Sequence, residues 1–217
     1  MKHVIKVTLF LAVLFFAAQV IGLIIVDKYV VAQDVYTGEI SWKALPSVGG
    51  VDIERPDISP EKSFLYILGA IIIGTLLILL LIKWGKVNLW KLWFLIAVTL
   101  CLHVAFSAFI SANISIVLAL VLGILKVYKP NIYIHNFTEL FIYSGLAVIF
   151  VPIMNLFAAF ALLILLSFYD MYAVWKSKHM IGMAKFQTKS GVFAGILMPY
   201  TLKVSKKGKR QEGCQED

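Results

Sequence analysis

The chain has 217 residues, of which 61% are hydrophobic and 15% are charged, and its mean hydropathy is +0.90. These values exclude an ordinary soluble domain and indicate an integral membrane protein. The formal net charge of +8 is explained by basic residues beside membrane spans, so nucleic acid is not expected as a partner.

Six apolar runs predict six membrane-spanning helices, because lipid offers the backbone no hydrogen-bond partner and only helix satisfies it within one segment. The fourth and fifth runs are short against the roughly 17 to 25 residues that cross the hydrocarbon. We therefore expect an all-α, polytopic membrane helix bundle, with the six-helix domain over residues 1–175. The predicted spans are residues 4–26, 63–82, 89–110, 112–127, 138–152 and 154–175.

The first run follows a basic start that includes Lys2 and Lys6, which is also typical of a signal peptide. Its apolar core is too long for a signal peptide, and no convincing cleavage site with small residues follows it. We expect it to be a retained membrane anchor.

Residues 27–62 form the longest connection between the predicted spans. They contain Pro46, Pro56 and Pro60 together with two adjacent glycines, Gly49 and Gly50. This composition predicts an irregular, exposed loop and not a folded domain.

The distribution of lysine and arginine orients the predicted bundle. If the N-terminus is cytoplasmic, 16 of the 20 basic residues fall on the cytoplasmic side, and the other four lie in the first loop among seven acidic residues. We therefore predict a multi-pass protein of the cell membrane with both termini cytoplasmic and residues 27–62 outside.

The third predicted span carries His103, Ser107 and Ser111 at intervals of four, so they share one face of the helix. Rhomboid-type proteases place their serine and histidine on different helices, and no G-x-S-x-G motif is present, so helix packing is the expected role. The cysteines, Cys101 and Cys214, have no metal-ligand spacing with a histidine. We expect no cofactor.

Glu139 lies near the start of the fifth predicted span, on the side that the charge count makes cytoplasmic. It is a candidate for a second carboxyl beside an acidic residue of the sixth span. A solvated glutamate is ordinary at such a boundary, so we predict that Glu139 is solvated.

The sixth predicted span contains an aspartate, Asp170, in the sequence LSFYDMYAVWK. Asp170 precedes Lys176 by six positions, which places it roughly 9 Å below the end of the helix at 1.5 Å per residue. Ionisable residues inside spans are costly and usually functional. The alternative is a structural aspartate that reaches the interface or pairs with Lys126, Lys129 or Lys176.

Tyr169 and Asp170, within an apolar sixth span that a basic segment follows, resemble the YD motif of the presenilin-type intramembrane aspartyl proteases. The likeness is greatest to archaeal presenilin homologues and covers their first six helices. It implies that Asp170 is the first of two catalytic aspartates, with Tyr169 in a supporting role. The implied substrates are single-span membrane proteins and remnant signal peptides.

The family's second aspartate belongs to a GxGD motif on the seventh helix, and a PAL motif on the ninth helps to shape the site. Neither motif occurs in these residues. One aspartate cannot be both base and acid in water attack, so the chain is expected to be inactive alone. We expect a truncated or frameshifted N-terminal portion. The alternatives are a natural fragment that assembles with a separate C-terminal piece, and a non-proteolytic channel or transporter subunit that uses Asp170 as a proton or cation site.

Residues 176–217 are predicted to be a basic cytoplasmic tail that favours anionic membrane lipids. Its first part, residues 179–200, is moderately amphipathic and suits the membrane surface. Beyond Pro199 the composition is polar and typical of disorder.

Overall fold

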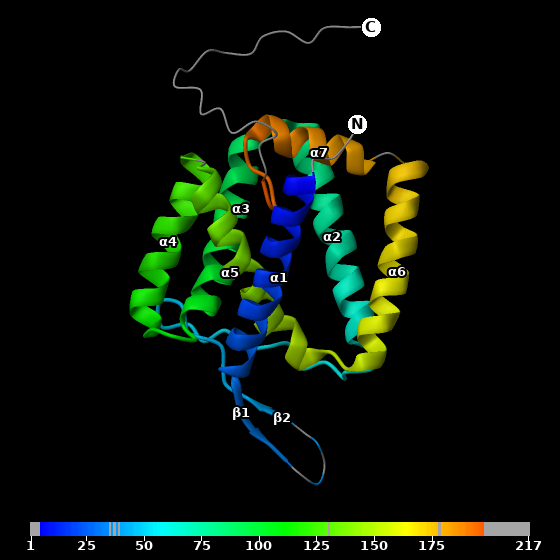
Figure 1. The fold of residues 1–217 in the computed structure, drawn as a ribbon. Coiled ribbons are helices and arrows are strands. Elements are labelled where there is room, and N and C mark those ends of the chain that lie inside the picture. The colour runs from blue at the N-terminus through cyan, green and yellow to red at the C-terminus, as the bar shows by residue number, and fades with distance from the viewer. Residues whose placement is uncertain are drawn as a thin grey trace, which may run out of the picture.

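The computed structural model describes residues 5–34, 36, 38, 40–129, 131–177 and 179–197 (Figure 1). The predicted disorder beyond Pro199 lies outside these residues. The elements are α1 (Ile5–Asp27), β1 (Val30–Gln33), β2 (Ile40–Trp42), α2 (Ser63–Trp84), α3 (Val87–Phe106), α4 (Ala112–Tyr128), α5 (Ile132–Phe150), the 3-10 turn η1 (Val151–Ile153), α6 (Leu156–Trp175) and α7 (His179–Ser190).

The predicted all-α membrane bundle is confirmed. Five helices, α1, α2, α3, α5 and α6, are long and apolar enough to cross a membrane, and α4 is a shorter apolar helix of 17 residues. The prediction of a short fifth span is wrong, because α5 begins at Ile132, six residues before the expected start. The Asn131 side chain accepts a hydrogen bond from the Tyr133 N–H at 3.0 Å and so caps the helix there.

The helices form two groups. In the larger, α3 packs against α4 and α5, and α1 packs against α5, around buried side chains that include Leu102, Phe106 and Ile142. In the smaller, α2 packs against α6. Figure 1 shows this pair standing at one side, with α7 lying across the end of the bundle where α1 begins. The α2–α3 turn and α7 therefore hold α2 and α6 to the rest of the molecule.

Two glycines end helices at this end of the bundle. Gly85 follows α2 with a φ of 63°, and Gly191 follows α7 with a φ of 71°. A left-handed residue directly after a helix lets the next amides bond back to its last carbonyls, as Lys86 N does to Leu81 O at 3.2 Å and Val192 N to Gln187 O at 3.3 Å. Gly191 thus turns the chain from α7 back toward the bundle.

The first loop is largely irregular and exposed, as predicted, but it also contains a short hairpin and a buried anchor. Strands β1 and β2 pair as an antiparallel hairpin at the end of the bundle opposite α7 (Figure 1). At its base Tyr29 is 2% exposed, and its hydroxyl donates to Val104 O at 2.8 Å and lies 2.7 Å from Ser107 Oγ. Burial raises the pKa of the Tyr29 hydroxyl, which therefore stays neutral. The loop is anchored to α3 by this tyrosine.

Gly145 marks the closest approach of α3 and α5. A Cβ atom built on Gly145 would lie 2.1 Å from the carbonyl oxygen of Cys101. We expect Gly145→Ala to force the two helices apart and to lower the free energy of unfolding by about 3 kcal/mol, the upper end of the usual overpacking range. Gly69→Ala is the matched control, because a Cβ there meets no atom within 4 Å. Equal stability of the two variants in a detergent unfolding titration would contradict the close contact.

Candidate functional site

Asp170 lies on α6, five residues before the helix ends at Trp175. Its side chain is exposed, and no hydrogen bond or ion pair joins it to another described residue. The predicted alternative of a structural pair with Lys126 does not occur, because Lys126 binds Glu139. Lys176 lies 5.9 Å from the ring centre of Tyr172 instead. The carboxylate of Asp170 is therefore without a partner in the described part of the chain.

Within the described part of the chain, no helix covers the face of α6 that carries Asp170. The buried positions of α6 are Ala158 and Ala173, where α6 meets its neighbours. At about 100° per residue Asp170 lies roughly 60° around the helix from Ala173, at the edge of the packed stripe. Leu163 and Ser167, which share its face, are exposed. Asp170 therefore stands at the edge of the α2–α6 pair, beside exposed surface of α6.

The hydroxyl of Tyr169 links α6 to two other helices by hydrogen bonds. Its hydroxyl donates to Thr75 Oγ1 of α2 at 3.1 Å and lies 3.3 Å from Nε2 of His179, the first residue of α7. Nδ1 of the same imidazole lies 2.5 Å from Ser177 Oγ. Tyr169 thus fixes the helix that carries Asp170, although its hydroxyl does not bind Asp170 itself.

Thr75 and His179 are the residues of this site that the sequence did not reveal. Thr75 is a hydroxyl-bearing residue in the middle of an otherwise apolar run, and that interruption is the signal that was available. His179 begins a helix whose packing against α2 and α6 depends on contacts that no local pattern encodes.

Replacing Tyr169 with phenylalanine removes both hydrogen bonds and leaves the ring. We expect the free energy of unfolding to fall by about 1 kcal/mol, because a neutral hydrogen bond contributes roughly 0.5 to 1.5 kcal/mol and His179 is left half-satisfied. The control is Tyr172→Phe, one turn along, where the exposed tyrosine makes no described hydrogen bond through its hydroxyl. If both variants unfold alike, the Tyr169 hydroxyl does not hold α6 in place.

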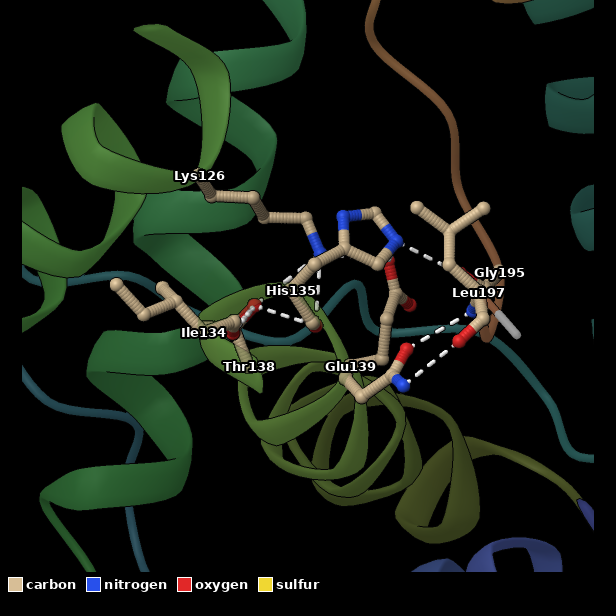
Figure 2. Close-up of polar contacts among 8 residues, drawn as sticks. Lys126, Ile134, His135, Thr138, Glu139, Gly195 and Leu197 are labelled. Atoms are coloured by element: carbon tan, nitrogen blue, oxygen red, sulfur yellow. Dashed lines mark hydrogen bonds and ion pairs between the residues drawn. The ribbon is translucent and has the colours of Figure 1, made fainter. Parts of the chain in front are cut away.

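A second polar cluster lies between α4 and α5 (Figure 2). Lys126 Nζ lies 2.6 Å from Glu139 Oε1, and the two side chains are 1% and 2% exposed. Lys126 also donates to Thr138 Oγ1 at 3.2 Å, and His135 Nε2 lies 3.7 Å from Glu139 Oε1. The prediction that Glu139 is solvated is therefore wrong. Glu139 is a buried member of an ion pair, so it is not the free second carboxyl of a catalytic pair.

The same end of α5 binds the chain segment that follows α7. Asn136 donates through Nδ2 to Leu197 O at 2.8 Å and accepts from Leu197 N at 2.9 Å. His135 Nε2 donates to Gly195 O at 2.7 Å (Figure 2). Val192 is 3% exposed within the core. Part of the segment that was expected on the membrane surface is therefore inserted into the bundle.

The three polar residues predicted to share one face of the third span do not all lie on α3. The helix ends at Phe106, so Ser107 follows it, and Ser111, which is exposed, precedes α4.

His103 and Ser107 have the packing role that was expected. Ser107 binds Tyr29, and His103 Nδ1 lies 2.6 Å from Ser115 Oγ of α4. His103 and Ser115 lie on different helices, but both are fully buried at 0% exposure, and Ser47 O of the first loop lies 3.3 Å from His103 Nε2. A substrate carbonyl cannot reach this serine.

Among the described residues no three His, Cys, Asp or Glu side chains come together in a way that could hold a metal ion. The acidic group at the α6 site is the carboxylate of Asp170. Such a group needs a second acid for hydrolysis.

Comparison with known proteins gives one family. The sequence pattern of the family described as "Signal-peptide peptidase, presenilin aspartyl protease" matches residues 44–216, which include α2 to α7 and Asp170. No curated protein and no solved structure matches the chain. Because the family pattern covers well over half of the sequence, the chain belongs to the signal-peptide peptidase and presenilin family of aspartyl proteases.

Proposed function

We propose that this chain supplies Asp170 as the first of two catalytic carboxylates in an intramembrane aspartic endopeptidase. The observation that carries the proposal is the state of Asp170. It lies within the range that the family pattern matches, is unpaired among the described residues and stands beside exposed helix surface. Its resemblance to the family's YD motif supports the same role. Family membership favours this role over the channel or transporter subunit. The second aspartate would come from a GxGD-bearing helix that docks along the Asp170 face of α6.

Two carboxylates in one site repel each other, so one keeps a proton while the other is ionised. The ionised group takes a proton from water, and the resulting hydroxide attacks the carbonyl carbon of the scissile peptide bond. The protonated carboxyl then donates to the leaving nitrogen, and the C–N bond breaks. Asp170 alone can fill one of these two positions, so residues 1–217 are proposed to be inactive without a second acid.

The proposed substrates are single-span membrane proteins and remnant signal peptides. Their helices must unwind locally, because a helical carbonyl is already hydrogen-bonded and covered by side chains. Access of water from the cytoplasmic end follows if both termini are cytoplasmic, as the lysine and arginine distribution predicts. The GxGD helix is proposed to come either from the same polypeptide or from a separate one that assembles with this chain.

Reconstitution tests this proposal directly. Liposomes would receive residues 1–217 alone, a family segment with the GxGD and PAL helices alone, or both, with a fluorescent single-span substrate. We expect cleavage only when both are present. Cleavage by residues 1–217 alone would show that the second carboxyl is not missing. No cleavage from the mixture, with both pieces inserted and associated, would count against the protease assignment.

A further inference from the structure

A groove of about 350 Å³ lies between α2 and α3. Nine residues line it, all of them apolar, among them Gly74 and Trp84 on α2 and Trp90 and Trp93 on α3. Gly74 and Trp84 are ten residues apart, so the groove extends for about 15 Å along the helix. A Cβ built on Gly74 meets no atom within 4 Å, which shows that the wall is hollow at this glycine.

One wall of the groove contains a polar atom that has no partner. Trp90 is 5% exposed, and its Nε1 is buried without an acceptor among the described residues. Its ring lies near two other rings, with centroid distances of 5.9 Å to Phe94 and 6.3 Å to Phe186. Because Nε1 itself is buried, a molecule in the groove contacts the ring of Trp90 and not this nitrogen. The lining therefore favours an apolar occupant.

The α2–α3 turn beside the groove is positively charged. Lys83 and Lys86 are exposed and Lys91 is half-buried, and no described acidic residue pairs with any of them. The sequence itself contains no Asp or Glu between Glu61 and Glu139. Three cations without counter-ions at the level of interfacial tryptophans favour an anionic headgroup.

We propose that α2, α3 and their turn form a binding site for one anionic phospholipid. An acyl chain fills the groove between Gly74 and Trp84, and the phosphate lies among Lys83, Lys86 and Lys91. The lipid complements the groove in apolar character and the turn in charge. This site is separate from Asp170 and does not depend on the proteolytic role.

Tryptophan quenching by brominated lipid tests the site on the full chain. In a background of Trp42→Phe and Trp175→Phe, the remaining tryptophans are the three of the groove. The chain is placed in nanodiscs of neutral lipid, and dibrominated phosphatidylglycerol or dibrominated phosphatidylcholine is titrated in. We expect phosphatidylglycerol to quench at about tenfold lower mole fraction, because each interfacial lysine favours anionic lipid.

Two sets of matched variants distinguish a specific lipid site from general electrostatic attraction of anionic lipid to the protein surface. Replacing Lys83, Lys86 and Lys91 with glutamine should abolish the preference for phosphatidylglycerol. Replacing Lys28, Lys43 and Lys62, which are exposed in the first loop at the opposite end of the bundle, removes the same charge and should leave the preference intact. Gly74→Leu should reduce quenching by both lipids by filling the groove, whereas Gly69→Leu, on the same helix but outside the lining, should not.

Several results would overturn the proposal. Equal quenching by the two lipids would show that the groove does not select anionic lipid. An equal loss of preference in both lysine triples would show attraction to the surface as a whole. Absence of quenching would show that another protein segment covers the groove. The lysine variants change exposed or half-buried side chains, so they test the site even if Gly74→Leu does not fold.

Discussion

Asp170→Asn is expected to reduce intramembrane cleavage by about 10³-fold or more. Asparagine keeps the size of the side chain but can neither take a proton from water nor deliver one to the leaving nitrogen, and general acid–base groups contribute on the order of 10² to 10⁴ each. The two carboxylates also act as one unit, so losing one of them removes most of the rate acceleration that the pair provides.

The measurement is the initial rate of substrate cleavage in liposomes that contain residues 1–217 together with the GxGD and PAL helices. Ser167→Ala is the matched control, since Ser167 is exposed on the same face of α6, one turn before Asp170. We expect this variant to cleave at close to the unmodified rate. An Asp170→Asn protein that retains half of the activity would rule out a catalytic role for this residue.

Breaking the Lys126–Glu139 pair is expected to have the largest effect on stability. Both side chains are buried, and removing one partner leaves an uncompensated charge between α4 and α5, which costs about 3–5 kcal/mol. We expect Glu139→Leu and Lys126→Met each to lower the free energy of unfolding by this amount. The double variant Lys126→Met/Glu139→Leu should recover most of the loss, because it removes both charges and keeps apolar volume.

Unfolding titrations in mixed detergent micelles measure these differences, and Lys129→Met is the control because Lys129 is exposed three residues further along. Hydrogen exchange at the Leu197 amide gives a second reading. Loss of Glu139 should disturb His135 and Asn136 and so release the segment that they bind, which would speed exchange there. Single variants within 0.5 kcal/mol of the unmodified protein would contradict the buried pair.

Hydropathy was sufficient to predict the helices because a membrane span is encoded locally. The second, third and sixth predicted spans agree with α2, α3 and α6 to within four residues at each end. The fifth failed for a physical reason. Residues 132–137 precede the predicted start of the span and include two polar side chains, His135 and Asn136, which look like a boundary of the apolar run. Both are buried and hydrogen-bonded to the carbonyls of Gly195 and Leu197, about 60 residues further along the chain.

The Glu139 prediction failed for the same reason. From the sequence alone a glutamate near the start of a span is ordinary, and its burial depends on Lys126 approaching from α4. The inserted segment after α7 likewise follows from Gly191 and from acceptors and donors on α5. Asp170 could be singled out because a charged residue in an apolar run is visible without any knowledge of its neighbours.

Disulfide trapping tests the central claim most directly, namely that Asp170 faces a second catalytic aspartate across two helices. In a background free of Cys101 and Cys214, cysteine replaces Asp170 and the aspartate of the GxGD helix, and mild oxidation follows in the membrane. We predict rapid cross-linking of this pair, and much slower cross-linking when the cysteine is at Leu163, two turns away on the same face. Cross-linking at Leu163 that matches or exceeds that at position 170 would contradict the account.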